Sequence, residues 1–400
     1  MKRFCTLFLI FATLLCGCTD AEFYDISSSA APLDGSGTES VPVGSDCMYE
    51  ILPMLSDSQY VNGEFWTMCK IDLRTGLASP LCYDPACLHD LSCPAVDVNY
   101  FDVTDDGKYV YFRKNDFSDS DNPESVLYVY RAETGEVEEL DRHEFNNRHW
   151  VIAAFDDGVV FNKCVVTEKD EFGNELAFTN TLYKLAPDGT LRELFEDSRL
   201  FDYWRRGDKA YTLTNDGYIV FDSNLQEVQT IGTGATAEME MNIALQMPFF
   251  GATVQNAEGE QEGFLYYRKE DGSYGRHSLS KEWIRGYFMH NMYWVIEDHS
   301  AVETPVEIGG VMLYPSLFTV RCMDPYTGQT VRKVDLSKEF DRLGITGISG
   351  MQTPTRRGKQ GITGNYQMFT LTMDGTPSCR VLLNADTGEV LRIHFGYEEG

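Results

Sequence analysis

The sequence predicts an all-β protein folded as a β-propeller, on three observations. Short runs of aromatic and β-branched residues recur along the chain, residues typical of tight turns separate them, and the turns return at a nearly even interval. Segments with the period of a helix are scarce, and we expect only a turn or two of helix at 279–287 and at 335–344. We therefore expect four-stranded antiparallel blades, seven in number, with six or eight as the alternatives.

The apolar runs are the predicted strands. Each is four or five residues long, which suits one strand of a blade, and branched or aromatic side chains pack well on a pleated sheet. The clearest runs lie at 109–112, 126–130, 181–185, 263–267, 292–296, 317–321 and 368–372.

Hairpin turns carry the repeat. Each turn contains a Gly or an Asn, because a tight hairpin needs a residue at positive φ. The turn residues are Gly76, Gly135, Gly189, Asn224, Gly272, Gly328 and Gly388. The average step is about 52 residues, which fits a four-stranded blade with its loops. A pair of β-sandwiches is the alternative, and it would show similar turns without an even period.

The first 17 residues predict an export signal. A basic start, Lys2 and Arg3, precedes an apolar run that is too short to span a membrane permanently, and Gly17 stands just before Cys18. This order resembles a bacterial lipobox. The resemblance implies that Cys18 is acylated and becomes the first residue of the mature protein, with an ordinary cleaved signal peptide as the alternative.

Residues 18–46 predict a flexible tether, because Ser, Gly, Ala, Pro and acidic residues dominate and little can be buried. The remaining residues, 47–400, are expected to form a single propeller domain. The expected location is extracytoplasmic, with the domain held at the cell membrane by the lipid on Cys18.

Charge limits the partners. The chain has 33 Lys and Arg against 62 Asp and Glu, a net charge of −29. Loss of Lys2 and Arg3 with the leader makes the mature charge −31. Such a surface repels nucleic acid and anionic lipid headgroups, so we expect no nucleic-acid partner and attachment through the lipid alone.

Several segments resemble known propeller families. The hairpins at 130–140 and 383–393 resemble those of quinoprotein-type repeats, and 103–112 resembles a strand of TolB-type propellers. The Cys-rich segment after the first hairpin resembles one found in uncharacterised TolB-like propeller lipoproteins of gut Firmicutes. The resemblance implies a fold and a location and implies no activity.

The Cys-rich segment, 81–94, contains Cys82, Cys87, His89 and Cys93. These four residues could form a tetrahedral Cys₃His zinc site, since thiolates and imidazole are the usual ligands of structural zinc. The two-residue step from Cys87 to His89 is unusual for zinc. We expect no cofactor other than this possible structural zinc.

Two other interpretations of the segment remain open. In an exported protein, Cys87 and Cys93 could form a disulfide, while Cys82 pairs with Cys47 or Cys69. Alternatively, one thiol is free and reactive, although the sequence shows no base paired with it.

A second candidate cation site is an acidic loop. Asp116, Asp119, Asp121 and Glu124 alternate oxygen side chains, but the loop lacks the Gly and the final Glu of an EF-hand. An ordinary solvated surface is the alternative.

The sequence favours binding over catalysis. It contains no G-x-S-x-G, H-E-x-x-H or Walker A pattern. We expect the propeller to bind or scaffold an extracellular protein, peptide or glycan. One alternative is an extracytoplasmic hydrolase or lyase that acts on carbohydrate through carboxylates in the central channel. The other is a non-catalytic, metal-responsive sensor or assembly factor.

Overall fold

The computed structural model describes the chain from residue 46 to residue 395, apart from short gaps. The gaps are 56–63, 83–86, 88, 90, 105, 118, 120–121, 146–151, 172–174, 197–203, 207–208, 215, 223–225, 235–236, 256–259, 280–282, 290–291, 299–305, 309–310, 314–317, 346–347, 353–361, 364–365, 374–375 and 385–386. The leader, Cys18 and the tether up to residue 45 lie outside the described residues.

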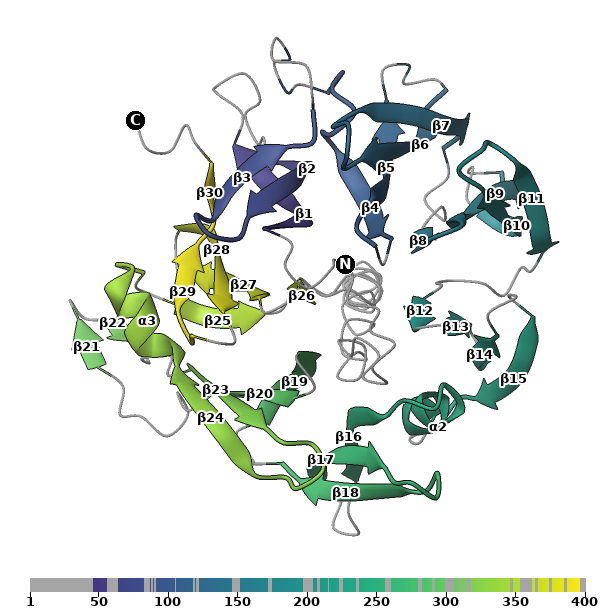
Figure 1. Ribbon diagram of the computed structural model, residues 1–400. Coiled ribbons are helices and arrows are strands. Elements are labelled where there is room, and N and C mark those ends of the chain that lie inside the picture. Colours follow the sequence, from purple (N-terminus) through teal and green to yellow (C-terminus); the bar gives the residue numbers. More distant parts are fainter. Residues whose placement is uncertain are drawn as a thin grey trace, which may run out of the picture.

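Antiparallel sheets stand side by side around a ring (Figure 1). Within the described residues, seven sheets have three to five strands, which equals the number of predicted hairpin turns. We number these sheets blades 1 to 7 in chain order. The prediction of an all-β propeller with mainly four-stranded antiparallel blades is confirmed.

Blades 1 to 4 each have four strands. Blade 1 consists of β1 (Cys47–Leu55), β2 (Glu64–Asp72), β3 (Leu77–Pro80) and β30 (His394–Phe395). Blade 2 consists of β4 (Val98–Val103), β5 (Tyr109–Asp116), β6 (Glu124–Arg131) and β7 (Val137–Glu144). Blade 3 consists of β8 (Ile152–Phe155), β9 (Gly158–Lys169), β10 (Glu175–Leu185) and β11 (Leu191–Glu196). Blade 4 consists of β12 (Trp204–Arg206), β13 (Lys209–Thr214), β14 (Gly217–Phe221) and β15 (Glu227–Gly232).

Blades 5 to 7 vary more. Blade 5 consists of β16 (Phe249–Gln255), β17 (Gln261–Arg268) and β18 (Tyr274–Ser278). Blade 6 consists of β19 (Trp283–Met289), β20 (Met292–Asp298), β23 (Phe318–Met323) and β24 (Thr330–Asp335), with a separate hairpin of β21 (Val306–Ile308) and β22 (Val311–Leu313). Blade 7 consists of β25 (Ile348–Gln352), β26 (Ile362–Thr363), β27 (Tyr366–Met373), β28 (Thr376–Asn384) and β29 (Val390–Arg392).

Two helices interrupt the strands in the described part of the chain. One is α3 (Leu336–Arg342), which confirms the helical turn expected at 335–344; the Asp335 side chain accepts a hydrogen bond from the Lys338 backbone N–H at its start. The helical turn expected at 279–287 is wrong from Trp283 on, where β19 begins, and residues 280–282 lie outside the described residues. The other helix, α2 (Ala237–Ala244), was not predicted. No helix in the described residues is long and apolar enough to cross a membrane.

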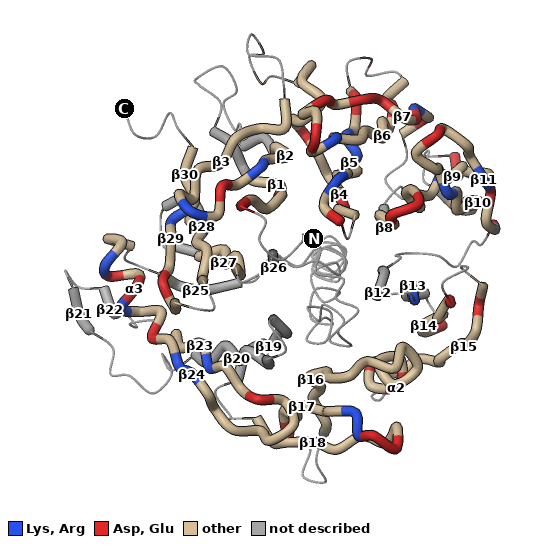
Figure 2. The backbone as a smooth tube through the Cα atoms, in the orientation of Figure 1, with Lys and Arg blue, Asp and Glu red and all other residues tan. Residues whose placement is uncertain are grey.

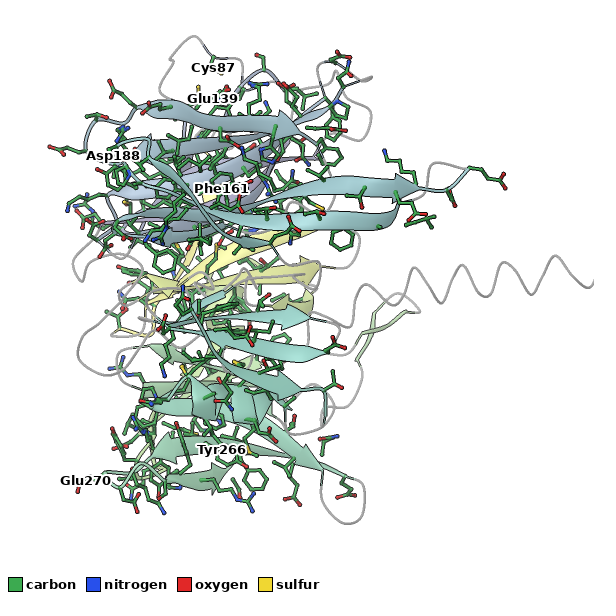
Figure 3. All side chains as sticks on the ribbon, turned by 90° about the vertical axis from the view of Figure 1, so that its right-hand side faces the viewer. Cys87, Glu139, Phe161, Asp188, Tyr266 and Glu270 are labelled. Atoms are coloured by element: carbon green, nitrogen blue, oxygen red, sulfur yellow. The ribbon has the colours of Figure 1, made fainter. Side chains whose placement is uncertain are left out.

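The predicted turn glycines have the backbone that the sequence analysis required. Six of them have φ between 69° and 85°, namely Gly76, Gly135, Gly189, Gly272, Gly328 and Gly388. Asn224, the seventh predicted turn residue, lies outside the described residues. Figure 3 places Asp188 and Glu270, which lie in two of these turns, on the same face of the ring; we call it the turn face.

The core lies mainly between blades rather than within them. Six clusters of buried apolar side chains each contain residues of two neighbouring blades. The cluster between blades 4 and 5 also includes Met241 of α2 and Met323 of blade 6. Since each blade shares its apolar faces with two neighbours, the blades support one another around the ring.

The two ends of the propeller meet in blade 1. The short strand β30 runs parallel to β3, with His394 opposite Leu77 and Phe395 opposite Ala78. Beside it, Ile393 and Phe395 are buried against Met48 and other residues of blades 1 and 7. The C-terminal strand thereby closes the ring.

Candidate metal centre and binding pocket

The Cys-rich segment connects β3 of blade 1 with β4 of blade 2. Both of its ends are fixed to Met68 of β2: the Leu81 N–H donates to the Met68 carbonyl, and the Met68 N–H donates to the Ala95 carbonyl, both over 2.8 Å. The segment therefore lies where it was expected, directly after the first hairpin. Figure 3 shows Cys87 at the outer edge of the ring.

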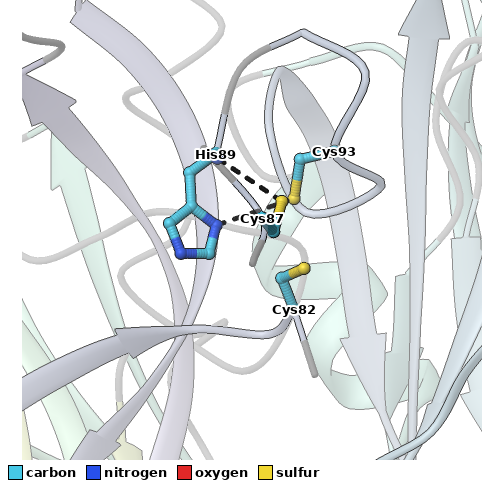
Figure 4. A group of neighbouring side chains, drawn as sticks. All are labelled: Cys82, Cys87, His89 and Cys93. Atoms are coloured by element: carbon cyan, nitrogen blue, oxygen red, sulfur yellow. Dashed lines mark hydrogen bonds between the residues drawn. The ribbon is translucent and has the colours of Figure 1, made fainter. Parts of the chain in front are cut away.

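The four predicted side chains come together (Figure 4). The ligand atoms of Cys82, Cys87, His89 and Cys93 all lie within 4.8 Å of one another, so the group could hold a metal ion. A tetrahedral zinc ion with bonds of about 2.0 to 2.3 Å places its ligand atoms about 3.5 to 3.8 Å apart. A contraction of about 1 Å at the widest pair brings this group to that geometry.

The backbone at His89 explains how the unusual Cys87–His89 step is accommodated. His89 has a φ of 51°, in the left-handed region that residues with a side chain rarely adopt. Its N–H donates to Cys87 Sγ over 3.4 Å, and its ring Nδ1 lies 3.8 Å from Cys93 Sγ. The turn at His89 thus directs both its backbone and its ring toward the sulfur atoms.

The cysteines of this group are thiols in the structure. No disulfide joins any of the eight cysteines between residues 46 and 395. Burial, together with the neighbouring thiols of Cys87 and Cys82, raises the pKa of the Cys93 thiol, despite a hydrogen bond from the Ala95 backbone.

Lys114 of β5 holds the segment from the neighbouring blade. Its side chain is buried, and its ammonium group donates to the Leu91 carbonyl and, over 2.9 Å, to the Cys93 carbonyl. The same charge lies near Asp97; burial raises the pKa of that carboxyl, and Lys114 opposes the rise. The sequence analysis missed Lys114, and the signal for it was a Lys that continues a strongly apolar strand.

The predicted acidic cation loop is linked to an arginine. Asp116 and Glu124 lie opposite each other on β5 and β6, and Arg142 of β7 contacts both carboxylates, at 3.2 and 2.6 Å. Asp119 accepts a hydrogen bond from the Asn122 side chain. Asp121 lies outside the described residues, and cation binding here stays a prediction.

Two buried carboxylates near the centre of the ring accept hydrogen bonds from backbone N–H groups. Glu50 of β1 accepts from the Ile51 N–H over 2.9 Å. Asp102 of β4 accepts from the Val103 N–H over 2.9 Å and, across the blade interface, from the Ala154 N–H over 2.6 Å. Both carboxylates are therefore engaged in hydrogen bonds that stabilise the blades.

A second candidate site is an open pocket of about 660 Å³ between blades 5 and 6. Its lining is Pro248, Tyr267, Arg268, Lys269, Glu270 and Tyr326. Pro248 directly precedes β16, Tyr267 and Arg268 end β17, and Lys269 and Glu270 begin the turn after it. Tyr326 comes from the turn between β23 and β24. Glu270 places the pocket on the turn face (Figure 3). The sequence analysis did not identify this site, because its two halves lie far apart along the chain.

The ring of blades and the Cys–His cluster define a β-propeller protein with a candidate metal centre. No family model and no curated protein matches the chain. A solved prolyl endopeptidase is similar to it at 14% identity and a TM-score of 0.48, over 87% of this chain and 49% of that one. The chain thus spans about half the length of that peptidase.

Two further solved structures are similar at lower TM-scores. An oligogalacturonate lyase of Vibrio parahaemolyticus has 11% identity and a TM-score of 0.43, over 86% of this chain and 92% of that one. TolB of Acinetobacter baumannii has 13% identity and a TM-score of 0.29, over 82% of this chain and 61% of that one. At these identities the similarities concern the fold alone.

Proposed function

We propose that this chain is an extracytoplasmic lipoprotein, anchored through Cys18, whose propeller binds an extracellular glycan, peptide or protein. The observation that carries the binding role is the pocket between blades 5 and 6. It combines two aromatic rings with charged side chains on an open face, which is the composition of a recognition site. The leader and the lipobox-like order at Gly17 and Cys18 support the location.

The binding role is favoured over the enzymatic alternative by the use of the buried acids. A hydrolase or lyase of the kind considered above needs carboxylates that converge on substrate. Among the described residues of the inner strands, Glu50 and Asp102 instead accept backbone hydrogen bonds. The described pocket lining contains a single carboxylate, that of Glu270.

The binding role is tested by a glycan, peptidoglycan and peptide array probed with the intact, detergent-solubilised protein. Specific retention of one ligand class supports the proposal. Turnover of a retained glycan would support the enzyme instead, and retention of nothing on any array contradicts the binding role. Metabolic labelling with a fatty-acid analogue tests the anchor: label is expected on the wild type and not on Cys18→Ala.

We further propose that Cys82, Cys87, His89 and Cys93 hold a structural zinc ion. The mutual approach of the four ligand atoms supports this. Protein purified without reductant is expected to contain about one zinc ion per chain. Cys93→Ser should lose most of the zinc, whereas Cys164→Ser, which changes a buried thiol outside the group, should retain it. A zinc-free wild type with two fewer free thiols would instead establish the disulfide.

A further inference from the structure

We propose that the pocket between blades 5 and 6 binds an acidic saccharide, with its tyrosines against the sugar rings and its basic residues on the carboxylate. This inference rests on the proposed binding function and names the ligand class of that site. It is carried by the arrangement of the aromatic rings, by the glycines that make room for them and by the local charge.

The aromatic side chains form a supported corner. Tyr267 stacks on His277 with ring centroids 4.9 Å apart and planes 15° apart. Tyr326 stands at 70° to Tyr267, with centroids 6.3 Å apart, and packs edge-on against the buried Phe249 at 4.8 Å. The His277 ring also contacts the Tyr326 carbonyl through Nε2, over 2.9 Å. The two tyrosines are thus fixed from behind while 60% of Tyr326 stays exposed.

Two glycines are required for this arrangement. A Cβ at Gly275 would lie 2.4 Å from the Tyr267 ring, and one at Gly328 would lie 2.7 Å from the His277 ring. Both distances are well inside van der Waals contact, so any side chain at either position would displace the ring beside it. Glycine at these two positions therefore leaves the space that the rings of Tyr267 and His277 occupy.

The charge of the pocket differs from that of the molecule. The chain as a whole carries a net charge of −29, whereas the lining has Arg268 and Lys269 against Glu270. Figure 2 shows the basic residues at the end of β17, directly before the acidic residues of the turn. Asp271, the next residue of the turn, lies near Lys269 and is not part of the pocket lining. On such an acidic protein, the two cations of the lining can hold an anionic ligand through charge-assisted hydrogen bonds.

An acidic saccharide matches both properties at once. One face of a pyranose ring presents C–H groups that can lie flat on an aromatic ring, and a uronic acid adds a carboxylate at the ring's edge. Since the two tyrosines meet at a steep angle, one can contact a sugar face while the basic residues reach the carboxylate. The open shape leaves room for further sugar units on either side.

The test is calorimetric titration of the intact, solubilised protein with β-1,4-linked tetraglucuronate and with cellotetraose, which differ only in the carboxylates. Tetraglucuronate is expected to bind at least about tenfold more tightly than cellotetraose. Tyr326→Ala should weaken tetraglucuronate binding about tenfold, and Lys269→Gln about threefold. Tyr326 is 60% exposed, but its ring contacts the buried Phe249, so the denaturation midpoint of Tyr326→Ala is measured beside the affinity and is expected to stay close to that of the wild type.

Matched controls are Phe117→Ala, which removes a 52% exposed aromatic ring from blade 2, and Lys108→Gln, which removes an exposed cation there; neither should change binding. Equal affinity for both tetrasaccharides, or tighter binding of an N-acetylated tetraglutamate peptide, overturns the inference. If the arrays identify a ligand that Tyr326→Ala binds as well as the wild type, the inference fails while the binding function stands. If no array yields a ligand, the binding function itself fails.

Discussion

Lys114 places a positive charge on the backbone of the Cys-rich segment, in a position that is 4% exposed. A zinc ion held by three thiolates and a neutral imidazole carries one negative charge overall. The ammonium group of Lys114 therefore complements the charge of the proposed centre while it fixes the carbonyls of Leu91 and Cys93.

Replacement of this lysine should loosen the centre. Lys114→Met is expected to lower the free energy of unfolding by about 3 kcal/mol, because the buried carbonyl of Cys93 and the part-buried carbonyl of Leu91 lose a charged donor. The zinc content should fall as well. Lys108→Met is the control, since Lys108 is exposed, and its effect should stay within about 0.5 kcal/mol. Urea titration and metal analysis measure both effects, and equal stability of the two variants would contradict the role of Lys114.

Asp141 links blades 2 and 3 through a second local network. Its carboxylate contacts His143 at 2.9 Å and Lys163 of β9 at 2.8 Å. Burial alone would raise the pKa of Asp141, but the hydrogen bonds from His143 and Lys163 outweigh burial and lower it. A carboxyl whose pKa is lowered by folding stabilises the protein above its unfolded pKa, about 4, and loses that contribution as the pH falls through the folded pKa.

The pH dependence of Asp141→Asn follows from that sign. At pH 7 the variant should be less stable than the wild type by about 2 kcal/mol, and the difference should shrink as the pH falls below about 4. Chemical denaturation at pH 7 and pH 3 measures the difference. Asp157→Asn, at an exposed ion pair, should show little difference at either pH. If the stability difference between Asp141→Asn and the wild type were the same at both pH values, the Asp141 carboxylate would not contribute in the way described.

At the scale of single residues, the sequence predicted which side chains of the Cys-rich segment lie close together, but not the contacts that hold them there. The spacing of Cys82, Cys87 and Cys93 sufficed to predict a cluster, because short segments keep such residues close. The left-handed backbone of His89 and the reach of Lys114 from the next blade depend on tertiary contacts that no local pattern records.

Among the elements, the hairpin turns were the most predictable. A Gly between two apolar runs predicts positive φ on local grounds, and the described turns have it. The segment 279–287 was misread, because its helical pattern is overridden by pairing of β19 with β20. The helix α2 was missed because its eight residues give too short a pattern to recognise.

Two of the turn glycines share a positive φ but differ in the space around them, so alanine substitutions at these two positions can be compared directly. At Gly189 a Cβ would meet nothing within 4 Å, whereas at Gly76 it would lie 2.3 Å from the Arg392 carbonyl oxygen. Gly189→Ala should lower the free energy of unfolding by about 1 to 2 kcal/mol, the cost of the left-handed backbone alone. Gly76→Ala should cost about 2 kcal/mol more, because the turn must also move away from the Arg392 carbonyl at the end of β29. Equal losses in denaturant titration would show that this close approach is unimportant.

For the whole molecule, the sequence predicted the propeller architecture, but it did not predict that the C-terminal strand β30 closes the ring by pairing with β3. An even period of hairpins was enough to predict a propeller, because each blade repeats one supersecondary unit. The closing strand β30 has two residues, and its pairing with β3 joins opposite ends of the chain. A strand this short carries no periodic signal, so only the assembled ring shows it.

Removal of the closure should destabilise the entire ring. A chain that ends at Arg392 loses β30 and the buried Ile393 and Phe395, and its free energy of unfolding should fall by about 3 to 5 kcal/mol. A chain that ends at Phe395 keeps the strand and is the control. Denaturant midpoints and size-exclusion profiles of both chains measure the effect, and identical midpoints would contradict a closing role for β30.

Closure in blade 1 also has a mechanical consequence if the chain is anchored through Cys18, as proposed above. The strand β1 begins at Cys47, directly after the predicted tether, and is an edge strand that pairs with β2. A pulling force on the anchor would therefore act first on the Cys47–Asp72 pair and peel β1 away from β2. The Cys-rich segment is fixed to the same β2 at Met68. A metal ion bound in that segment would therefore stabilise blade 1, the blade on which the pulling force acts.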